Sequence, residues 1–218
     1  MCIRISMSSA FQIFECHYQS IKKLIRSADL YAIHALAAIK NEPVNIKQIE
    51  KIIKNENSHS LMVNSWEWVM SESEKELLKQ DHHISGLCEQ IVQTTYISIE
   101  NYLVNRFEEL LNTKVENKCV CEGIIKNLSF TSLKRIKKYY ADILDIRIAE
   151  FEPDITNRPN EWFDPNTSWE GIIMLSEARN EIAHEGHSEK YNIRYLADAY
   201  APWYFAWRWV GLFGSKFT

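Results

Sequence analysis

The segment "LSEARNEIAHEGH", residues 175–187, brings together side chains that can perform acid–base and phosphate chemistry. Arg179 and His184 are five positions apart, about 140° around a helix, and Asn180 lies between them in angle, about 40° from His184. Arginine supplies a permanent positive charge and a planar donor fork suited to phosphate, and histidine exchanges a proton near neutral pH. Because RNA carries its own 2′-hydroxyl nucleophile, these three side chains suffice for metal-free cleavage of a phosphodiester in RNA.

These side chains need an element that presents them on one side, and the surrounding sequence predicts a helix there. The string "TSWE" is typical of a capping box, in which Thr167 caps the amide of Glu170 and the glutamate side chain reaches back. Gly186 can end the helix near Glu185, since glycine readily adopts the left-handed conformation common at helix ends. The core-facing side of this helix is predicted to consist of Leu175, Ala178 and Ile182.

The rest of the chain predicts an all-α protein. Only six glycines and five prolines occur in 218 residues, so long stretches run without helix breakers. Apolar residues recur at helical spacing most clearly over residues 84–113, and Gly86 predicts that the regular part begins just after it. The segment 150–166 is irregular and long enough to be functional or disordered. Further helices are predicted over residues 8–41, 45–55, 60–80 and 130–149, and in an aromatic segment that closes the chain.

Composition and charge favour a soluble globular protein. Hydrophobic residues make up 46% and charged residues 25% of the chain, which is enough apolar surface for a sizeable core. The net charge of −4 argues against a protein that coats nucleic acid by bulk charge, but it leaves room for a local basic surface. The five cysteines are irregularly spaced and predict no disulfide framework. No secretory signal or membrane span is recognised, so a cytoplasmic location is expected.

The string "RNEIAH" resembles the Arg-x4-His signature of the HEPN family, the higher eukaryotes and prokaryotes nucleotide-binding domains found in many prokaryotic RNases. Asn180 adds to the resemblance, because a polar residue directly after the arginine is typical of that family. The motif also lies late in the chain, on a helix that follows a long helix and a variable loop. The resemblance covers roughly residues 84–212, and the first 80 residues show no recognisable family motif.

The resemblance implies an all-α, up-and-down helical bundle of HEPN type with extra N-terminal helices. Residues 1–80 would form an N-terminal helical arm or extension, and residues 81–218 would form the HEPN-like domain. The resemblance also implies a homodimer, in which the motif helices of two copies face each other and form one RNA-cleaving cleft.

The family's chemistry assigns a role to each residue of the motif. His184 would act as general base on the 2′-hydroxyl or as general acid on the leaving oxygen, Arg179 would stabilise charge on the phosphoryl group, and Asn180 would position His184 or the phosphate. Glu181 and His187 are candidates for supporting roles, Glu181 by orienting the ring of His184. The products would carry 2′,3′-cyclic phosphate ends, and neither a cofactor nor a metal ion would be needed.

The implied protein is a toxin or phage-defence effector that cleaves RNA, with tRNA among the candidate substrates. An antitoxin or another regulatory protein would be a further partner, and no membrane association is expected. Some HEPN toxins extend the motif to His-x-Tyr, and a partner nucleotidyltransferase modifies that tyrosine. Gly186 stands at this position here, so we expect this chain to lack that form of regulation.

Other interpretations of the same segment stay open. Nine arginines and seven histidines make a chance pair at one spacing unsurprising, and cations in a last helical turn also favour the helix dipole. The alternative function is a non-catalytic helical module that binds RNA, a nucleotide or a partner protein, and a buried His184 would favour it. The string "HEGH" places two histidines three residues apart, whereas the helical zinc-binding pattern needs four, so no metal site is predicted.

A second candidate surface is the string "LKRIKKYY", which combines four cations with two tyrosines. One interpretation is contact with the RNA backbone, with Tyr139 and Tyr140 available for stacking on bases. The other is a solvated helix face with no ligand. The candidate RNA-binding cations are Lys134, Arg135, Lys137 and Lys138.

Overall fold

The structure is a computed structural model of the whole chain, and it describes residues 8–47, 49–50, 71–78, 81–151, 169–186 and 196–217. Within these ranges the regular elements are all helices, which confirms the predicted all-α class. The chain divides into two compact units, each built from separate segments. Unit 1 comprises Met1–Tyr18, Tyr96–Glu177 and Phe205–Thr218, and unit 2 comprises Gln19–Thr95 and Ala178–Tyr204.

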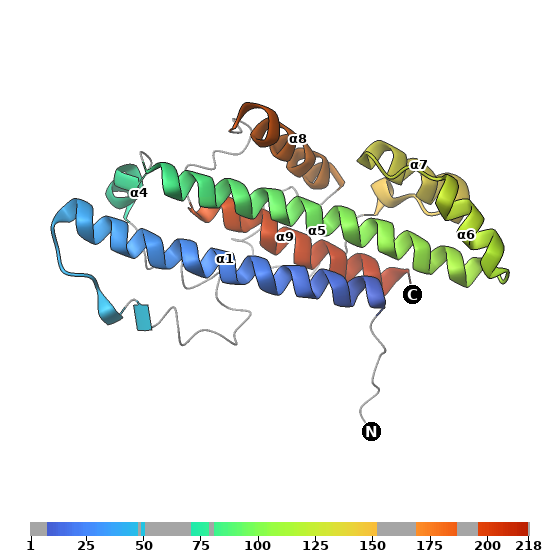
Figure 1. Cartoon of the computed structure of the whole chain (residues 1–218), viewed down its shortest axis with the longest axis horizontal. Helices are drawn as coiled ribbons and strands as arrows, with labels where there is room; N and C mark the ends of the chain where they lie inside the picture. Colours follow the sequence, from blue (N-terminus) through green and yellow to red (C-terminus); the bar gives the residue numbers. More distant parts are fainter. Residues whose placement is uncertain are drawn as a thin grey trace, which may run out of the picture. The chain divides into compact units, whose positions relative to one another are not determined.

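The described helices follow the sequence prediction in most places (Figure 1). The two longest, α1 and α5, agree with the predictions to within two residues at each end. The predicted helix at residues 45–55 and most of that at 60–80 lie outside the described residues. The elements are α1 (Ser9–Lys40), α4 (Glu72–Leu78), α5 (His82–Lys114), α6 (Lys118–Asn127), α7 (Leu133–Leu144), the short 3-10 helix η2 (Ile148–Glu150), α8 (Trp169–Glu185) and α9 (Leu196–Lys216).

The start of α5 corrects one prediction. The helix begins at His82, four residues before Gly86, so the prediction that the regular part starts after this glycine is wrong. The carboxylate of Asp81 accepts hydrogen bonds from the backbone N–H groups of His83 at 2.9 Å and Ile84 at 3.2 Å. This side-chain cap satisfies backbone donors of the first turn and starts the helix upstream of the glycine. Gly86 itself is exposed and lies within the helix.

The region predicted as one helix over residues 130–149 contains two elements, α7 and the short helix η2. Helix α7 ends at Leu144 because Asp145 adopts a left-handed conformation, with φ of 56°, and its N–H bonds back to the carbonyl of Tyr140. The short helix α6, capped by the side chain of Asn117, was not predicted from the sequence. Its ten residues carry only one buried side chain, Cys121, so the apolar stripe that reveals longer helices is missing.

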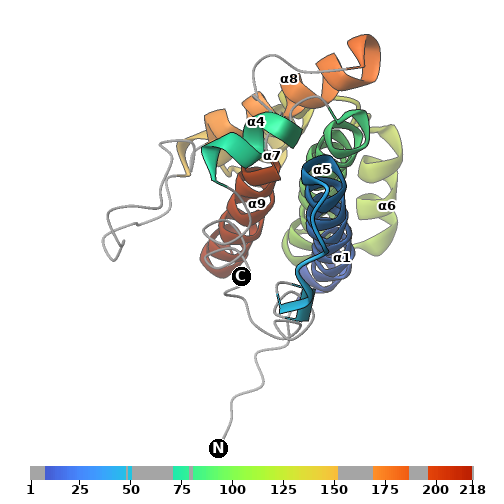
Figure 2. The same cartoon turned by 90° about the vertical axis from the view of Figure 1, so that its left-hand side faces the viewer.

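In unit 1, the first turns of α1 lie against the C-terminal part of α5, and both ribbon views show the two helices side by side (Figure 1, Figure 2). The ring of Phe14 contacts that of Tyr102 edge to face, with centroids 5.8 Å apart. Helix α9 adds Trp209 and Phe213, whose rings stack with centroids 4.9 Å apart. Close packing of α9 on α5 is also visible at Gly214, where an added Cβ would lie 3.0 Å from the Tyr102 hydroxyl.

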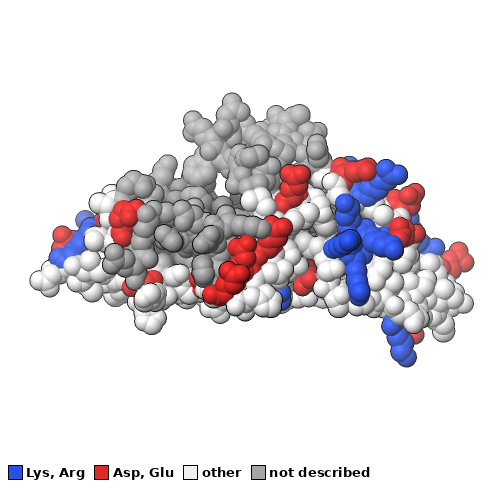
Figure 3. Space-filling model, turned by 90° about the horizontal axis from the view of Figure 1, so that it is seen from above, with Lys and Arg blue, Asp and Glu red and all other residues white. Residues whose placement is uncertain are grey.

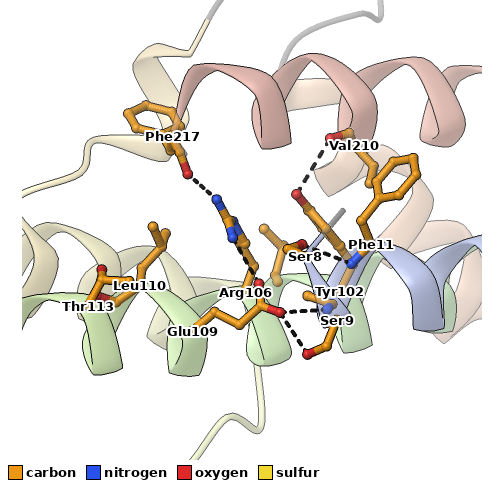
Figure 4. A network of polar contacts seen from close by, with 12 residues as sticks. Ser8, Ser9, Phe11, Tyr102, Arg106, Glu109, Leu110, Thr113, Val210 and Phe217 are labelled. Atoms are coloured by element: carbon orange, nitrogen blue, oxygen red, sulfur yellow. Dashed lines mark hydrogen bonds and ion pairs between the residues drawn. The ribbon is translucent and has the colours of Figure 1, made fainter. Parts of the chain in front are cut away.

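A buried charge network ties three segments of unit 1 together (Figure 4). The side chain of Arg106 is only 8% exposed, and it donates to the carboxylate of Glu109 at 2.8 Å and to the carbonyl of Phe217. The same carboxylate accepts from the hydroxyl of Ser9 and the N–H of Ala10, both at 2.7 Å. Glu109 therefore places a negative charge at the N-terminus of α1, where the helix dipole favours it.

Helix α7 is fixed to α5 within unit 1 by two kinds of contact. The hydroxyl of Tyr140, which is fully buried, donates to the carbonyl of Leu103 at 2.7 Å. The ammonium group of Lys114 donates to the carbonyl of Leu144 at the C-terminal end of α7. The buried side of α7 consists of Leu133, Ile136, Tyr140 and Leu144.

In unit 2, the C-terminal part of α1 is joined to the start of α5 and to α4. The hydroxyl of Tyr31 donates to the carboxylate of Asp81 at 3.2 Å, so the residue that caps α5 also binds α1. The ammonium group of Lys40 pairs with Glu74, which in turn accepts from the N–H of Ser71 at 2.7 Å. These contacts join α1 to α4 and to the residue that caps α5. The predicted division into residues 1–80 and 81–218 stays a prediction.

No helix among the described residues is long and apolar enough to cross a membrane.

We predict that Tyr140→Phe destabilises the protein more than Tyr139→Phe does. Tyr140→Phe removes a buried hydrogen bond of 2.7 Å to the Leu103 carbonyl, which costs about 1–1.5 kcal/mol. The hydroxyl of Tyr139 is only half-buried and makes two longer contacts of 3.4 Å to Ser129, so its loss should cost less than about 1 kcal/mol. Urea unfolding of both variants measures the difference, and equal losses would contradict the assignment.

We predict a loss of stability in mild acid that depends on Glu109. Burial raises the pKa of this carboxyl group, but the hydrogen bonds from Arg106, Ala10 and Ser9 outweigh burial and lower the pKa below its ordinary value. A lowered pKa in the folded state stabilises the protein above the unfolded pKa of about 4.3, and this contribution is lost as pH falls through the folded pKa. Glu109→Gln should therefore flatten the fall in unfolding free energy between about pH 5 and pH 3.

Candidate functional site

Helix α8 carries the Arg-x4-His motif, with Asn180 and His184 on its exposed side and Arg179 half-buried beside its buried side. Its buried side chains recur at spacings of three and four residues, as the sequence predicts for a core-facing stripe. The end of the helix is also as predicted: α8 stops at Glu185, Gly186 has a φ of 79°, and its N–H bonds to the carbonyl of Ile182 at 3.0 Å. The capping residue Thr167 lies outside the described residues. The buried side chains of α8 are Trp169, Ile172, Leu175, Ala178 and Ile182.

The structure brings Arg179 and Asn180 into direct contact. The guanidinium Nη1 of Arg179 donates to the Oδ1 of Asn180 at 2.8 Å. Since arginine can only donate, this bond also fixes which end of the amide faces the guanidinium. The amide oxygen is used on Arg179, and the amide nitrogen is the donor that Asn180 can offer to a phosphate or to the ring of His184. Asn180 thereby contributes to the orientation of the guanidinium fork.

His184 lies in the last turn of α8 with an exposed side chain, and Asn180 one turn earlier is exposed as well. A buried imidazole would favour the non-catalytic interpretation, whereas an exposed one can reach a substrate. Glu181 is half-buried one turn before His184, at the spacing at which side chains on one helix face meet. His187 lies outside the described residues. All three residues of the predicted catalytic set belong to unit 2.

The four candidate RNA-binding cations lie on α7 in unit 1, and all four are exposed. The guanidinium of Arg135 donates to the hydroxyl of Thr131 at 3.2 Å. The side chain of Ser132 accepts the backbone N–H of Arg135 and caps the helix. The sequence carried a signal for this cap, since serine is a preferred residue directly before a helix, but the helix was predicted to start at residue 130, three residues before Leu133.

The tyrosines beside these cations are not both available for stacking on bases. Tyr140 is fully buried and its hydroxyl is bonded to Leu103, so this part of the sequence interpretation is wrong. Tyr139 is half-buried, and its ring packs edge to face on Phe130 with centroids 5.4 Å apart. The helical period explains the difference, because Tyr140 follows Ile136 at four positions on the buried side and Tyr139 does not.

A metal centre has no support among the described residues, where no group of three or more His, Cys, Asp or Glu side chains could hold an ion. Cys119 is exposed and Cys121 is buried, with its thiol directed at the carbonyl of Val115 at 3.4 Å. The two thiols of the Cys-x-Cys string therefore differ in surroundings.

Comparison with known proteins found no relative of this chain. No family model matches the chain, and no match was found among curated proteins or solved structures. The function is therefore argued from the residues of the chain itself and from the resemblance carried by "RNEIAH".

Proposed function

We propose that the protein is a metal-independent endoribonuclease of HEPN type, with Arg179, Asn180 and His184 as its catalytic residues. The observation that carries the proposal is the arrangement at the end of α8. An exposed imidazole follows one turn after an exposed amide, and the amide oxygen binds the guanidinium at 2.8 Å. These are the groups that cleavage by an internal 2′-hydroxyl requires: a proton acceptor, a fixed cation and a donor that orients the substrate.

The proposed reaction is a transesterification within the RNA. His184 accepts the proton of the 2′-hydroxyl, whose oxygen attacks the adjacent phosphorus. Negative charge grows on the phosphoryl oxygens, where the Arg179 guanidinium stabilises it. The bond to the 5′-oxygen breaks, that oxygen takes a proton, and the products are a 2′,3′-cyclic phosphate and a 5′-hydroxyl.

One chain supplies one motif histidine, while the reaction uses both a base and an acid. We propose that a second copy supplies the acid, with the ends of the two α8 helices facing each other in a two-fold dimer. A toxin or defence effector is the biological role that fits such an RNase, and an antitoxin or regulatory protein is the partner that such a role requires.

We predict that His184→Ala and Arg179→Ala each reduce RNA cleavage strongly. Losing general acid–base help typically costs about 10²–10⁴-fold in rate, and Asn180→Ala should cost less because it only orients its neighbours. The exposed position of His184 means that the unfolding free energy should change by less than about 0.5 kcal/mol. His34→Ala, at an exposed histidine of α1, is the matched control and should cleave total RNA and tRNA like the wild type.

Wild-type cleavage by His184→Ala would remove the proposed mechanism. RNA binding by the wild type without any cleavage would favour the non-catalytic module instead.

We predict that cleavage persists in excess EDTA. A nuclease that uses metal ions activates water with them and loses activity on chelation, whereas here Arg179 takes the electrostatic role. The measurement compares cleavage rates of tRNA with and without EDTA, and with added Mg²⁺ as the reverse control. A rate that collapses in EDTA and returns with Mg²⁺ would contradict the assignment.

A further inference from the structure

Helix α7 carries an unusual concentration of positive charge for this protein. Four of its 12 residues are cations and one, Asp142, is an anion, while the whole chain has a net charge of −4. The cations occupy the N-terminal half of the helix, and all four are exposed. Seen from above, Lys and Arg side chains gather closely on the face of the molecule that carries α7 (Figure 3).

These cations form no ion pair with the carboxylates of the described residues. Among the described residues, no carboxylate lies within 4.0 Å of the charged groups of the four side chains, and Arg135 bonds to the neutral hydroxyl of Thr131 instead. Exposed cations elsewhere in the described ranges do form pairs: Arg147 with Glu150 at 3.3 Å and Lys118 with Glu122 at 4.0 Å. The positive charge of α7 is therefore directed to solvent.

The placement of the charges opposes the stability of the helix itself. The first turn of α7 contains no acidic residue, although the helix dipole favours anions there and disfavours cations. Lys134 and Lys138 also lie one turn apart on one face, and like charges at this spacing repel each other. An anion bound along this face would offset both the unfavourable helix dipole and the repulsion between the lysines. Without a bound anion, both effects remain.

The scaffold fixes the helix backbone that carries these side chains. The Tyr140 hydroxyl and the Lys114 ammonium group fasten α7 to α5, and Ser132 caps its start. Four residues of helix rise separate Lys134 from Lys138, which is about 6 Å along the axis. A row of cations on a rigid helix suits a chain of phosphates rather than a single compact anion.

We infer that the exposed face of α7, formed by Lys134, Arg135, Lys137 and Lys138, binds the phosphate backbone of single-stranded RNA. The inference rests on the proposed function for its choice of polyanion, and it adds a substrate-binding surface in unit 1 to the catalytic residues of unit 2. Because Tyr140 is buried and Tyr139 is packed on Phe130, this face contacts phosphates and does not stack on bases. Binding here is independent of sequence and depends strongly on salt.

The test measures binding to a fluorescein-labelled single-stranded oligouridine by anisotropy at several KCl concentrations, in a His184→Ala background that prevents cleavage. The first variant replaces the four cations with glutamine. Each phosphate contact to a single strand contributes about −0.7 to the slope of log affinity against log salt. Four contacts give a slope of about −3, or roughly a 50-fold loss of affinity between 50 and 200 mM salt, and the variant should lose this component.

The matched control replaces four other exposed lysines with glutamine, Lys23, Lys47, Lys118 and Lys126. It changes net charge by the same amount, so it should keep the steep salt slope if the α7 surface is responsible. Replacing the three lysines of α7 with arginine keeps the charge and should keep the binding. Thermal unfolding followed by circular dichroism shows whether each variant is folded.

Equal RNA binding by the α7 variant and the control variant overturns the inference. Binding of the α7 cations to phosphatidylserine vesicles and not to RNA also overturns it. The proposed function is tested separately with His184 intact. If the protein with His184 intact cleaves RNA and the α7 variant still binds RNA normally, the inference is refuted and the proposed function stands. Binding that depends on α7, without any cleavage, supports the inference and refutes the endoribonuclease.

Discussion

The buried guanidinium of Arg106 is the charge on which the packing of unit 1 depends. A charge that is 8% exposed must be paired and hydrogen-bonded to be tolerated. Its partners are Glu109 on the next turn, which also binds the start of α1, and the carbonyl of Phe217 after the end of α9. Removing one partner of such a buried pair typically costs about 3–5 kcal/mol. The network therefore fixes both ends of the described chain against α5.

The regular parts of this fold were predictable from the sequence, and the exceptions have physical causes. Long helices such as α1 and α5 repeat their apolar stripe many times, so their bounds could be predicted closely. Helix α6 could not, because it is short and buries a single side chain. The burial of Arg106 could not be predicted either, since a charged residue is normally solvated and its carbonyl partner is 111 positions away.

The candidate site was predictable as a set of residues but not as a geometry. The helical spacing of α8 predicts which side is buried, and Gly186 marks where the helix ends. The bond from Arg179 to Asn180 depends on side-chain rotamers, which the spacing leaves undetermined. On α7, the sequence identified the cations, and the four-residue spacing from Ile136 to Tyr140 already distinguishes the buried Tyr140 from Tyr139.

In the proposed reaction, the nucleophile belongs to the RNA, and His184 and Arg179 only assist it. The most direct measurement uses a synthetic RNA loop in which the nucleotide at a mapped cleavage site carries 2′-deoxyribose, compared with the all-ribose loop. The account predicts that cleavage stops at the substituted position and continues at unmodified sites, with 2′,3′-cyclic phosphate on those products. Cleavage at the 2′-deoxy position, or products that carry 5′-phosphate, would show that water is the nucleophile and would contradict the account.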